Sequence, residues 1–164
     1  MAEVNLSRAA GERRRYVLDG FGSIRFEGLF SRTATAESDG ERWRFVRRGV
    51  FAQRCSAFDQ AGAPVGQFEP RAIRRGGAVT WNGRQLTLRP ASAWRERYTL
   101  ADGDTELAHL DGKSWGRRPV AVSLEDSVAI EGGLLLFAAF VVRGLAEDAS
   151  ATAGAAAGIA ATGG

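Results

Sequence analysis

Two side chains in this sequence are candidates for acid-base chemistry: His109, the only histidine, and Glu96. His109 has Asp111 two residues away, and a histidine beside a carboxylate can act as a general base. Glu96 lies between Trp94 and Tyr98, on the face that alternation predicts to be the inner one, where a carboxylate must find a partner. No nucleophile stands at a fixed spacing from either residue. We therefore expect Glu96 to form a structural ion pair or to mark a β-bulge, and a small hydrolase or isomerase is the lesser hypothesis.

Cys55 is the only cysteine, which excludes an intramolecular disulfide and a cysteine-based zinc cluster. We expect it to be a small buried apolar residue. A histidine-rich metal site within one chain is also excluded, because the sequence has a single histidine. The glycine-rich segments lack the Lys-Ser/Thr tail of a phosphate-binding loop. The sequence thus predicts no metal, no cofactor and no enzymatic activity.

Arginine dominates the basic residues, since Lys113 is the only lysine among 22 Lys and Arg residues. The net charge is +3, yet the first 100 residues hold 18 basic and 10 acidic side chains. Arginines on one surface can bind lipid phosphates through bidentate hydrogen bonds, each adding about 1 kcal/mol near an anionic membrane. The alternative is a solvated outer face whose arginine content reflects GC-rich coding. The candidate ligands for an anionic head group are Arg42, Arg44, Arg47, Arg48, Arg71, Arg74, Arg75, Arg95 and Arg97.

Several aromatic residues alternate with these arginines, a pattern that superficially resembles a stacking platform for single-stranded nucleic acid. On a strand, however, neighbouring side chains point to opposite faces. We expect the aromatic side chains to point into the core, away from the arginines, and we predict no nucleic-acid partner. The residues concerned are Trp43, Phe45, Trp81 and Trp94.

Short segments of alternating apolar and polar residues run from Arg14 to Ile130, separated by Gly, Asp, Asn and Pro. Asn82-Gly83 is a favourable type I′ hairpin turn. Such spacing is typical of an all-β barrel or sandwich, and one-sided alternation favours antiparallel pairing. The expected strands lie near residues 15–18, 24–30, 33–38, 42–45, 50–58, 64–69, 79–81, 86–88, 94–100, 106–110, 118–124 and 127–131.

The pattern changes after Gly132-Gly133, which we expect to form a reversing turn. Leu134 to Val142 is apolar on all sides, which is typical of a buried helix and is too short for the ~20 residues of a membrane span. Leu134 to Asp148 as a helix is about 22 Å long, close to the height of a small barrel. We therefore predict an all-β-dominated fold, an antiparallel barrel of about twelve strands enclosing a hydrophobic C-terminal α-helix. The predicted organisation is a flexible segment at 1–13, the barrel domain at 14–148 and an Ala/Gly-rich tail at 149–164, either a frayed helix or disordered.

This order of elements resembles the tubby-like β-barrel superfamily, which includes the LURP-one-related and phospholipid-scramblase-like proteins. The resemblance rests on WRERYTLADGDTELAHLDGKSWGRRPVAVSLE, which has the pattern of two hairpins, and on VAIEGGLLLFAAFVVRGLAED, a strand leading into a hydrophobic helix. It implies a barrel threaded by its helix, and association with phosphoinositides or membranes. The sequence lacks a lipidated Cys-rich segment and a calcium loop, so lipid translocation is not implied. A lumen filled by a helix leaves only the outer surface or a rim for a ligand.

These observations predict a non-enzymatic binding or scaffold domain that attaches peripherally to anionic phospholipid through external arginines. The alternative is a protein-protein interaction or structural domain without a lipid ligand. The N-terminal residues have no apolar run of the kind that a signal or anchor needs. We therefore expect a cytoplasmic protein, peripheral at the membrane, with no transmembrane span.

Overall fold

The computed structural model describes residues 2–28, 32–49, 53–71, 75–113 and 117–161, with side chains described up to residue 154. These residues form twelve β-strands and one α-helix, α1, at Gly132–Ala161. The strands are β1 (Ala2–Arg8), β2 (Arg15–Leu18), β3 (Gly22–Glu27), β4 (Thr33–Ser38), β5 (Glu41–Arg48), β6 (Arg54–Phe58), β7 (Pro64–Pro70), β8 (Gly77–Trp81), β9 (Arg84–Pro90), β10 (Arg97–Asp102), β11 (Thr105–Gly112) and β12 (Val120–Leu124).

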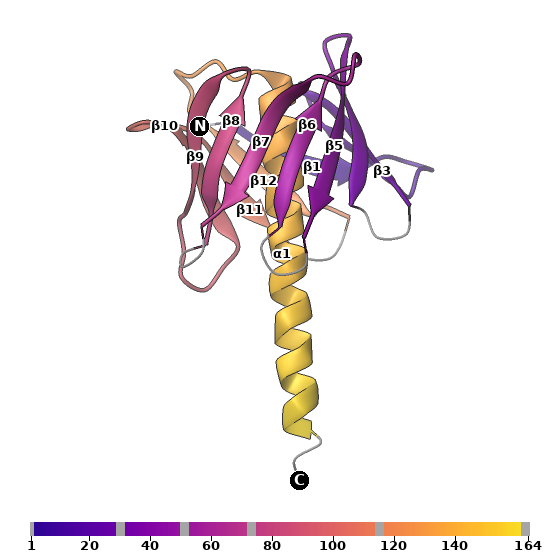
Figure 1. Cartoon of the computed structure of the whole chain (residues 1–164), viewed down its shortest axis with the longest axis vertical. Helices are drawn as coiled ribbons and strands as arrows, with labels where there is room; N and C mark the ends of the chain where they lie inside the picture. Colours follow the sequence, from indigo (N-terminus) through magenta and orange to yellow (C-terminus); the bar gives the residue numbers. More distant parts are fainter. Residues whose placement is uncertain (1, 29–31, 50–52, 72–74, 114–116, 162–164) are drawn as a thin grey trace.

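The strands form a closed antiparallel barrel in which each strand pairs with its neighbours in sequence and β1 pairs with β12 (Figure 1). Burial alternates along most strands because successive side chains point to opposite faces. Between β8 and β9, Asn82 and Gly83 both have positive φ, 47° and 81°, as a type I′ turn requires. The predicted barrel and its antiparallel pairing are confirmed.

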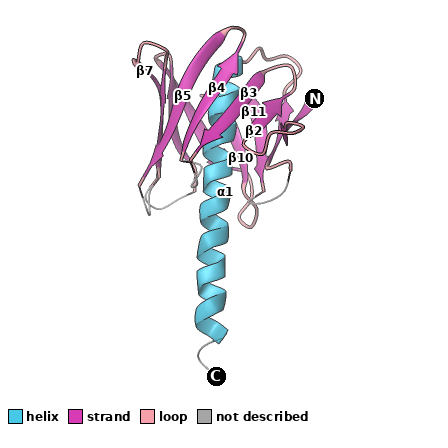
Figure 2. Cartoon of the chain, turned by 90° about the vertical axis from the view of Figure 1, so that its right-hand side faces the viewer, coloured by secondary structure: helices cyan, strands magenta, loops and turns pink. Residues whose placement is uncertain are grey.

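Helix α1 runs through the lumen and continues beyond the barrel at one end (Figures 1 and 2). Residues 134–142 are all buried, and the Phe137 ring lies 5.2 Å from that of Phe45 and 5.7 Å from that of Trp81. Inward-pointing aromatic side chains of the wall therefore fill the space around the helix. The prediction of a buried central helix is confirmed.

Gly132 and Gly133 begin the helix instead of forming the expected reversing turn. A Cβ atom on Gly133 would lie 2.7 Å from Trp43 and 2.8 Å from Trp81, so glycine is what lets the helix start this close to the wall. Trp81 Nε1 donates a hydrogen bond to Glu131 at 2.9 Å, which fixes the approach to the helix. The carboxylate also lies at the end of the helix where the dipole favours negative charge.

Two predictions about the ends of the barrel are wrong. Ala2–Arg8 form β1 and close the barrel, so this part of the expected flexible segment at 1–13 is ordered sheet. Residues 127–131, expected to be a strand, belong to the connection between β12 and α1. Only Leu6 in β1 is fully buried, so this strand has almost no alternating pattern to detect. Val128 and Ile130 do alternate with polar residues, but they pack against the core from a connection that is not part of the sheet.

Helix α1 extends to Ala161, well past the Asp148 boundary. Alanine has the highest helix propensity, which favours continuation of the helix through this Ala-rich segment. Residues 149–154 are exposed. Of the two forms expected for the tail, the structure has the helical continuation.

Candidate functional site

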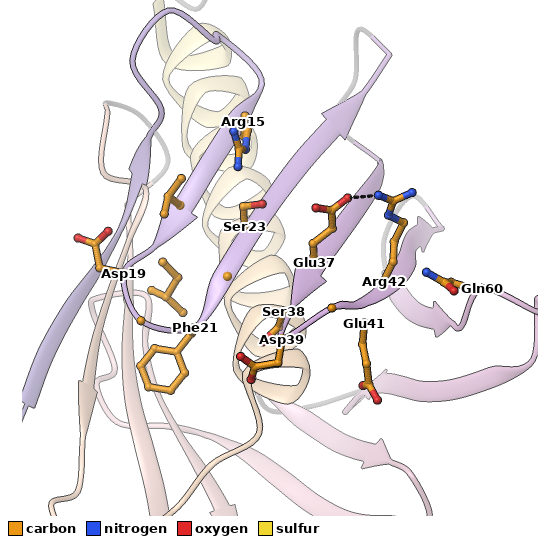
Figure 3. A pocket seen from close by; sticks show the side chains of 15 residues that line it. Arg15, Asp19, Phe21, Ser23, Glu37, Ser38, Asp39, Glu41, Arg42 and Gln60 are labelled. Atoms are coloured by element: carbon orange, nitrogen blue, oxygen red, sulfur yellow. Dashed lines mark ion pairs between the residues drawn. The ribbon is translucent and has the colours of Figure 1, made fainter.

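The strand β5 carries Arg42, Arg44 and Arg48 on the outer surface, as expected for external ligands. Arg42 is already paired with Glu37, at 2.6 Å (Figure 3). Arg44 and Arg48 have no ion pair within the described residues, and Arg48 lies directly opposite Arg54 of β6. The structure therefore leaves part of this outer wall free to bind anions.

The hollow shown in Figure 3 has a volume of about 540 Å³ and lies on the outside, between the β2–β3 and β4–β5 turns. Its lining has mixed charge: the carboxylates of Asp19, Asp39 and Glu41 accompany Arg15 and the Glu37–Arg42 pair. The carboxylates oppose the binding of an anion there. This hollow is therefore not the head-group site.

Arg47 is not external, which corrects the prediction for this residue. Only 7% of it is exposed, and its guanidinium contacts Glu147 of α1 at 3.2 Å. The physical reason is strand parity, the rule that every second side chain of a strand points to the same face: Arg47 shares the inner face of β5 with Trp43 and Phe45. The sequence prediction grouped it with its neighbours by proximity along the chain, and its role is to fix the helix inside the barrel.

A polar layer surrounds Arg47 where the helix leaves the barrel. Gln53 Nε2 donates to Asp148 at 2.8 Å, and Gly144 leaves room for the Arg47 side chain. Burial raises the pKa of Asp148, and the nearby charge of Arg47 partly opposes that rise. This layer belongs to the packing between helix and wall.

The other arginines predicted as ligands lie at several places near the end of the barrel from which α1 projects. Arg71 and Arg95 are exposed, with no side-chain ion pair in the described part of the chain, whereas Arg97 pairs with Asp111 at 3.0 Å. Arg75 is held by Glu96 at 2.6 Å. Arg74, also predicted as a ligand, lies outside the described residues.

Glu96 makes the structural ion pair that was expected. It accepts from Arg75 and, at 2.5 Å, from the Tyr98 hydroxyl. Burial raises the pKa of Tyr98, and its hydrogen bond to the Glu96 carboxylate raises it further. Both oxygens of Glu96 are therefore engaged in holding other side chains. The expected strand position was wrong, because β10 begins at Arg97 and Glu96 belongs to the preceding connection.

Trp94 is 95% exposed, which corrects its predicted place in the core. Trp43, Phe45 and Trp81 are buried as predicted. Trp94 lies in the connection between β9 and β10, where the strand alternation on which the prediction relied does not apply. A large apolar side chain with this exposure needs an explanation.

The backbone around Trp94 is firmly held. Arg75 donates to the carbonyl oxygens of Ala93, at 3.1 Å, and Arg95, at 2.8 Å. The hydroxyl of Ser92 accepts from the backbone N–H groups of Trp94 and Arg95, at 3.3 and 3.2 Å. The fold therefore presents the indole outward on a loop fixed from both sides.

The charges of the connections divide between the two ends of the barrel. Connections of an antiparallel meander alternate between the ends. We call the end reached by the connections β1–β2, β3–β4, β5–β6, β7–β8, β9–β10 and β11–β12 the helix-exit end, and the opposite end the helix-start end. Described basic residues of the helix-exit connections are Arg13, Arg14, Arg32, Arg71, Arg75, Arg95, Lys113, Arg117 and Arg118, against acidic Glu12 and Glu96.

The helix-start end has the opposite charge. Its described connections hold no basic residue, and Arg84, the first residue of β9, is paired with Asp102 at 2.8 Å. The acidic residues of these connections are Asp19, Asp39, Asp59, Asp104, Glu125, Asp126 and Glu131. Trp94 thus lies on the basic end of an electrically polar molecule.

His109 does not have the predicted partner. Asp111, two residues away, pairs with Arg97, whereas the Nε2 atom of His109 lies 3.4 Å from both Glu106 and Glu125. Glu106 was missed because a residue three positions from His109 points to the opposite face of a regular strand. Glu125 was missed because it comes from the connection after β12, which pairs with β11. The cluster belongs to the acidic helix-start end, opposite the basic helix-exit end.

No protein-family model, curated protein or solved structure matches this chain. The twelve-stranded barrel around a helix agrees with the fold expected from the tubby-like resemblance, and membership of that superfamily stays a prediction. Within the described part of the chain, no helix has both the length and the apolar character needed to cross a bilayer.

Proposed function

We propose that this protein is a non-enzymatic module that binds anionic phospholipid peripherally, through the helix-exit end of its barrel. The observation that carries the proposal is Trp94: a 95% exposed indole on a loop held by Arg75, next to the exposed Arg95. Tryptophan favours the boundary between water and lipid, where its ring is buried and its N–H remains hydrated. Arginine beside it adds attraction to lipid phosphate.

The surrounding charge supports the same partner. Each basic side chain near an anionic leaflet contributes about 1 kcal/mol. Every helix-exit connection except β5–β6 carries basic residues, but α1 projects from the same end, so one side of the rim at a time can meet a flat surface (Figures 1 and 2). The side that carries Trp94 also carries Arg71, Arg75 and Arg95, on the β7–β8 and β9–β10 connections. An anionic membrane is an extended surface, and it therefore suits several neighbouring basic side chains better than a small soluble anion does.

The sequences of the other helix-exit connections are consistent with this partner. The stretches between β3 and β4, β7 and β8, and β11 and β12 each include a large apolar residue close in sequence to basic ones: Phe30, Ile73 and Trp115. Apolar residues mixed with Arg are the composition of interfacial membrane-binding segments.

The test is co-sedimentation of the protein with vesicles of phosphatidylcholine alone, or with added phosphatidylserine or phosphoinositide, at low and physiological salt. We expect binding to the anionic vesicles only. Trp94→Ala should weaken it by about tenfold, because burying a large apolar side chain stabilises by about 1.5 kcal/mol or more. Arg71→Gln with Arg95→Gln should weaken it by about 30-fold, from ~1 kcal/mol for each charge.

A control variant that also loses two arginines tells whether the lipid site lies on the rim or on the outer wall of the barrel. Arg42→Gln with Arg44→Gln removes two arginines from the outer face of β5, and we expect a loss of less than about threefold because solvent screens distant charges. An equal or larger loss with this wall variant would move the lipid site to β5. Absence of binding to every vesicle would refute the lipid proposal, and the protein-interaction alternative would then take its place.

A further inference from the structure

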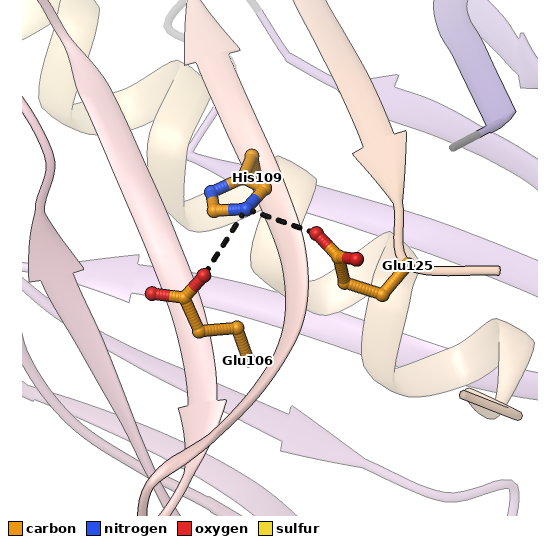
Figure 4. Close-up of side chains that lie close together, drawn as sticks. All are labelled: Glu106, His109 and Glu125. Atoms are coloured by element: carbon orange, nitrogen blue, oxygen red, sulfur yellow. Dashed lines mark ion pairs between the residues drawn. The ribbon is translucent and has the colours of Figure 1, made fainter. Parts of the chain in front are cut away.

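The three side chains Glu106, His109 and Glu125 converge on one point at the helix-start end (Figure 4). His109 Nε2 lies 3.4 Å from an oxygen of Glu106 and 3.4 Å from an oxygen of Glu125. All three ligand atoms lie within 4.8 Å of one another. One imidazole N–H cannot point at two carboxylates at once, and 3.4 Å exceeds the usual N–H···O distance of about 2.9 Å.

A β-bulge creates this arrangement. Residues three apart on a regular strand point to opposite faces, so Glu106 and His109 would not normally meet. The register between β10 and β11 shifts so that Leu100 pairs with Ala108 and Ala101 with Glu106. Leu107 is the extra residue, and the shift turns both Glu106 and His109 outward. Bulges commonly re-aim a side chain in this way at functional sites.

The distances fit a tetrahedral metal ion. With metal–nitrogen and metal–oxygen distances of about 2.0–2.2 Å, two ligand atoms of a tetrahedron are separated by about 3.4 Å. Both distances from His109 Nε2 have this value. The ligand atoms of Glu106 and Glu125 lie within 4.8 Å of each other, so the two carboxylates approach each other to complete the third edge.

Thr99 gives the imidazole a defined orientation. Its Oγ1 atom lies 3.0 Å from His109 Nδ1, and the Thr99 side chain is 6% exposed. When Nδ1–H donates to this oxygen, the lone pair of Nε2 faces the two carboxylates. Metal-binding histidines usually make such a second hydrogen bond.

We propose that Glu106, His109 and Glu125 bind one divalent transition-metal ion of the Zn²⁺ class. An imidazole with two carboxylates favours Zn²⁺ over Ca²⁺ and Mg²⁺, which prefer oxygen ligands alone. The ion takes the place of any proton on Nε2, which leaves to solvent. Arg89, 3.7 Å from Glu106, is the competing cation. The bound ion would connect β11 to the connection that leads into α1.

The experiment uses the full chain without a histidine tag, because His109 is then the only imidazole. Zn²⁺ is titrated by calorimetry, and the imidazole nitrogens are followed by NMR. We expect one equivalent of Zn²⁺ to shift the Nε2 resonance. Glu125→Gln should weaken binding by at least about tenfold, Thr99→Val by about tenfold through loss of orientation, and Arg89→Gln should strengthen it.

Glu41→Gln is the matched control, since Glu41 is an exposed carboxylate at the same end, and its affinity should equal that of the parent. Circular dichroism checks that each variant folds. Imidazole resonances that do not respond to excess Zn²⁺ would overturn the proposal and leave an ion-pair cluster only. Equal Zn²⁺ affinity in His109→Gln would also overturn it, by placing the ion elsewhere.

Discussion

Trp94 stays exposed because Arg75 holds the backbone on both sides of it. The guanidinium of Arg75 is in turn fixed by Glu96, which accepts a second hydrogen bond from Tyr98. This chain of contacts runs from the wall of the barrel to the tip of one loop. Glu96, which the sequence offered as a candidate acid, therefore serves to position an exposed residue. In the proposed function, Arg75 is a positioning residue and Trp94 is the contact.

The same residue-scale reasoning gives a prediction for Cys55. Its side chain is 2% exposed, and burial raises the pKa of the thiol to about 12, although the charge of Arg47 lowers it in part. Because the reactive form is the thiolate, alkylation by iodoacetamide at pH 8 should be negligible in the folded protein and fast after unfolding. Mass spectrometry with and without denaturant measures this. Rapid alkylation of the folded chain would show that the lumen opens near β6.

Strand parity explains which candidate residues the sequence could identify. Arg42, Arg44 and Arg48 are external because they alternate with inward residues, and the same rule places Arg47 inside. Parity applied strictly would have found Arg47. It could not have found the meeting of Glu106 with His109, because that depends on a bulge whose position is set by pairing with β10.

At the scale of elements, we predict that replacing Gly133 at the start of α1 by alanine lowers stability, which is the opposite of the usual effect in a helix. Gly→Ala within a helix normally stabilises by about 1 kcal/mol. Gly133→Ala would instead drive a methyl group into Trp43 and Trp81, which the close-packed lumen cannot accommodate. We expect a net destabilisation of about 1–2 kcal/mol from overpacking. Thermal unfolding followed by circular dichroism would show a Tm lower by several degrees.

Gly154→Ala is the matched control, because it lies in the same helix beyond the barrel and nothing lies within 4 Å of its added Cβ. Its Tm should be unchanged or slightly higher. If both variants gained stability, Gly133 would not contact the wall, and the helix would start farther from the tryptophans than the structure shows.

Most strands could be predicted because one face is dry. The alternation of β8 is complete, and that of β5 is complete from Arg42 onward. The Asn82-Gly83 turn marks the hairpin of β8 and β9. β1 has one fully buried residue, Leu6, so local pattern could not reveal that it closes the barrel. Closure depends on pairing between the two ends of the chain, which is a property of the whole sheet.

At the scale of the whole molecule, the order of the strands separates the charges of alternate turns onto opposite ends of the barrel. Successive connections reach opposite ends, so a chain whose turns are alternately basic and acidic has one basic rim and one acidic rim. This signal was present in the sequence: the net charge of +3 conceals it, and comparing alternate turns reveals it. The two proposals use the two rims separately, lipid at the helix-exit end and a metal ion at the helix-start end.

Membrane orientation is the central claim, and one pair of labelled variants tests it most directly. Since Cys55 is buried, one added cysteine, at Ala93 on the Trp94 loop or at Ala61 at the helix-start end, can carry an environment-sensitive NBD fluorophore. On phosphatidylserine vesicles, we predict a blue shift and stronger emission for the Ala93→Cys label and no change for the Ala61→Cys label. The reverse pattern, or equal changes at both labels, would contradict docking through the basic end.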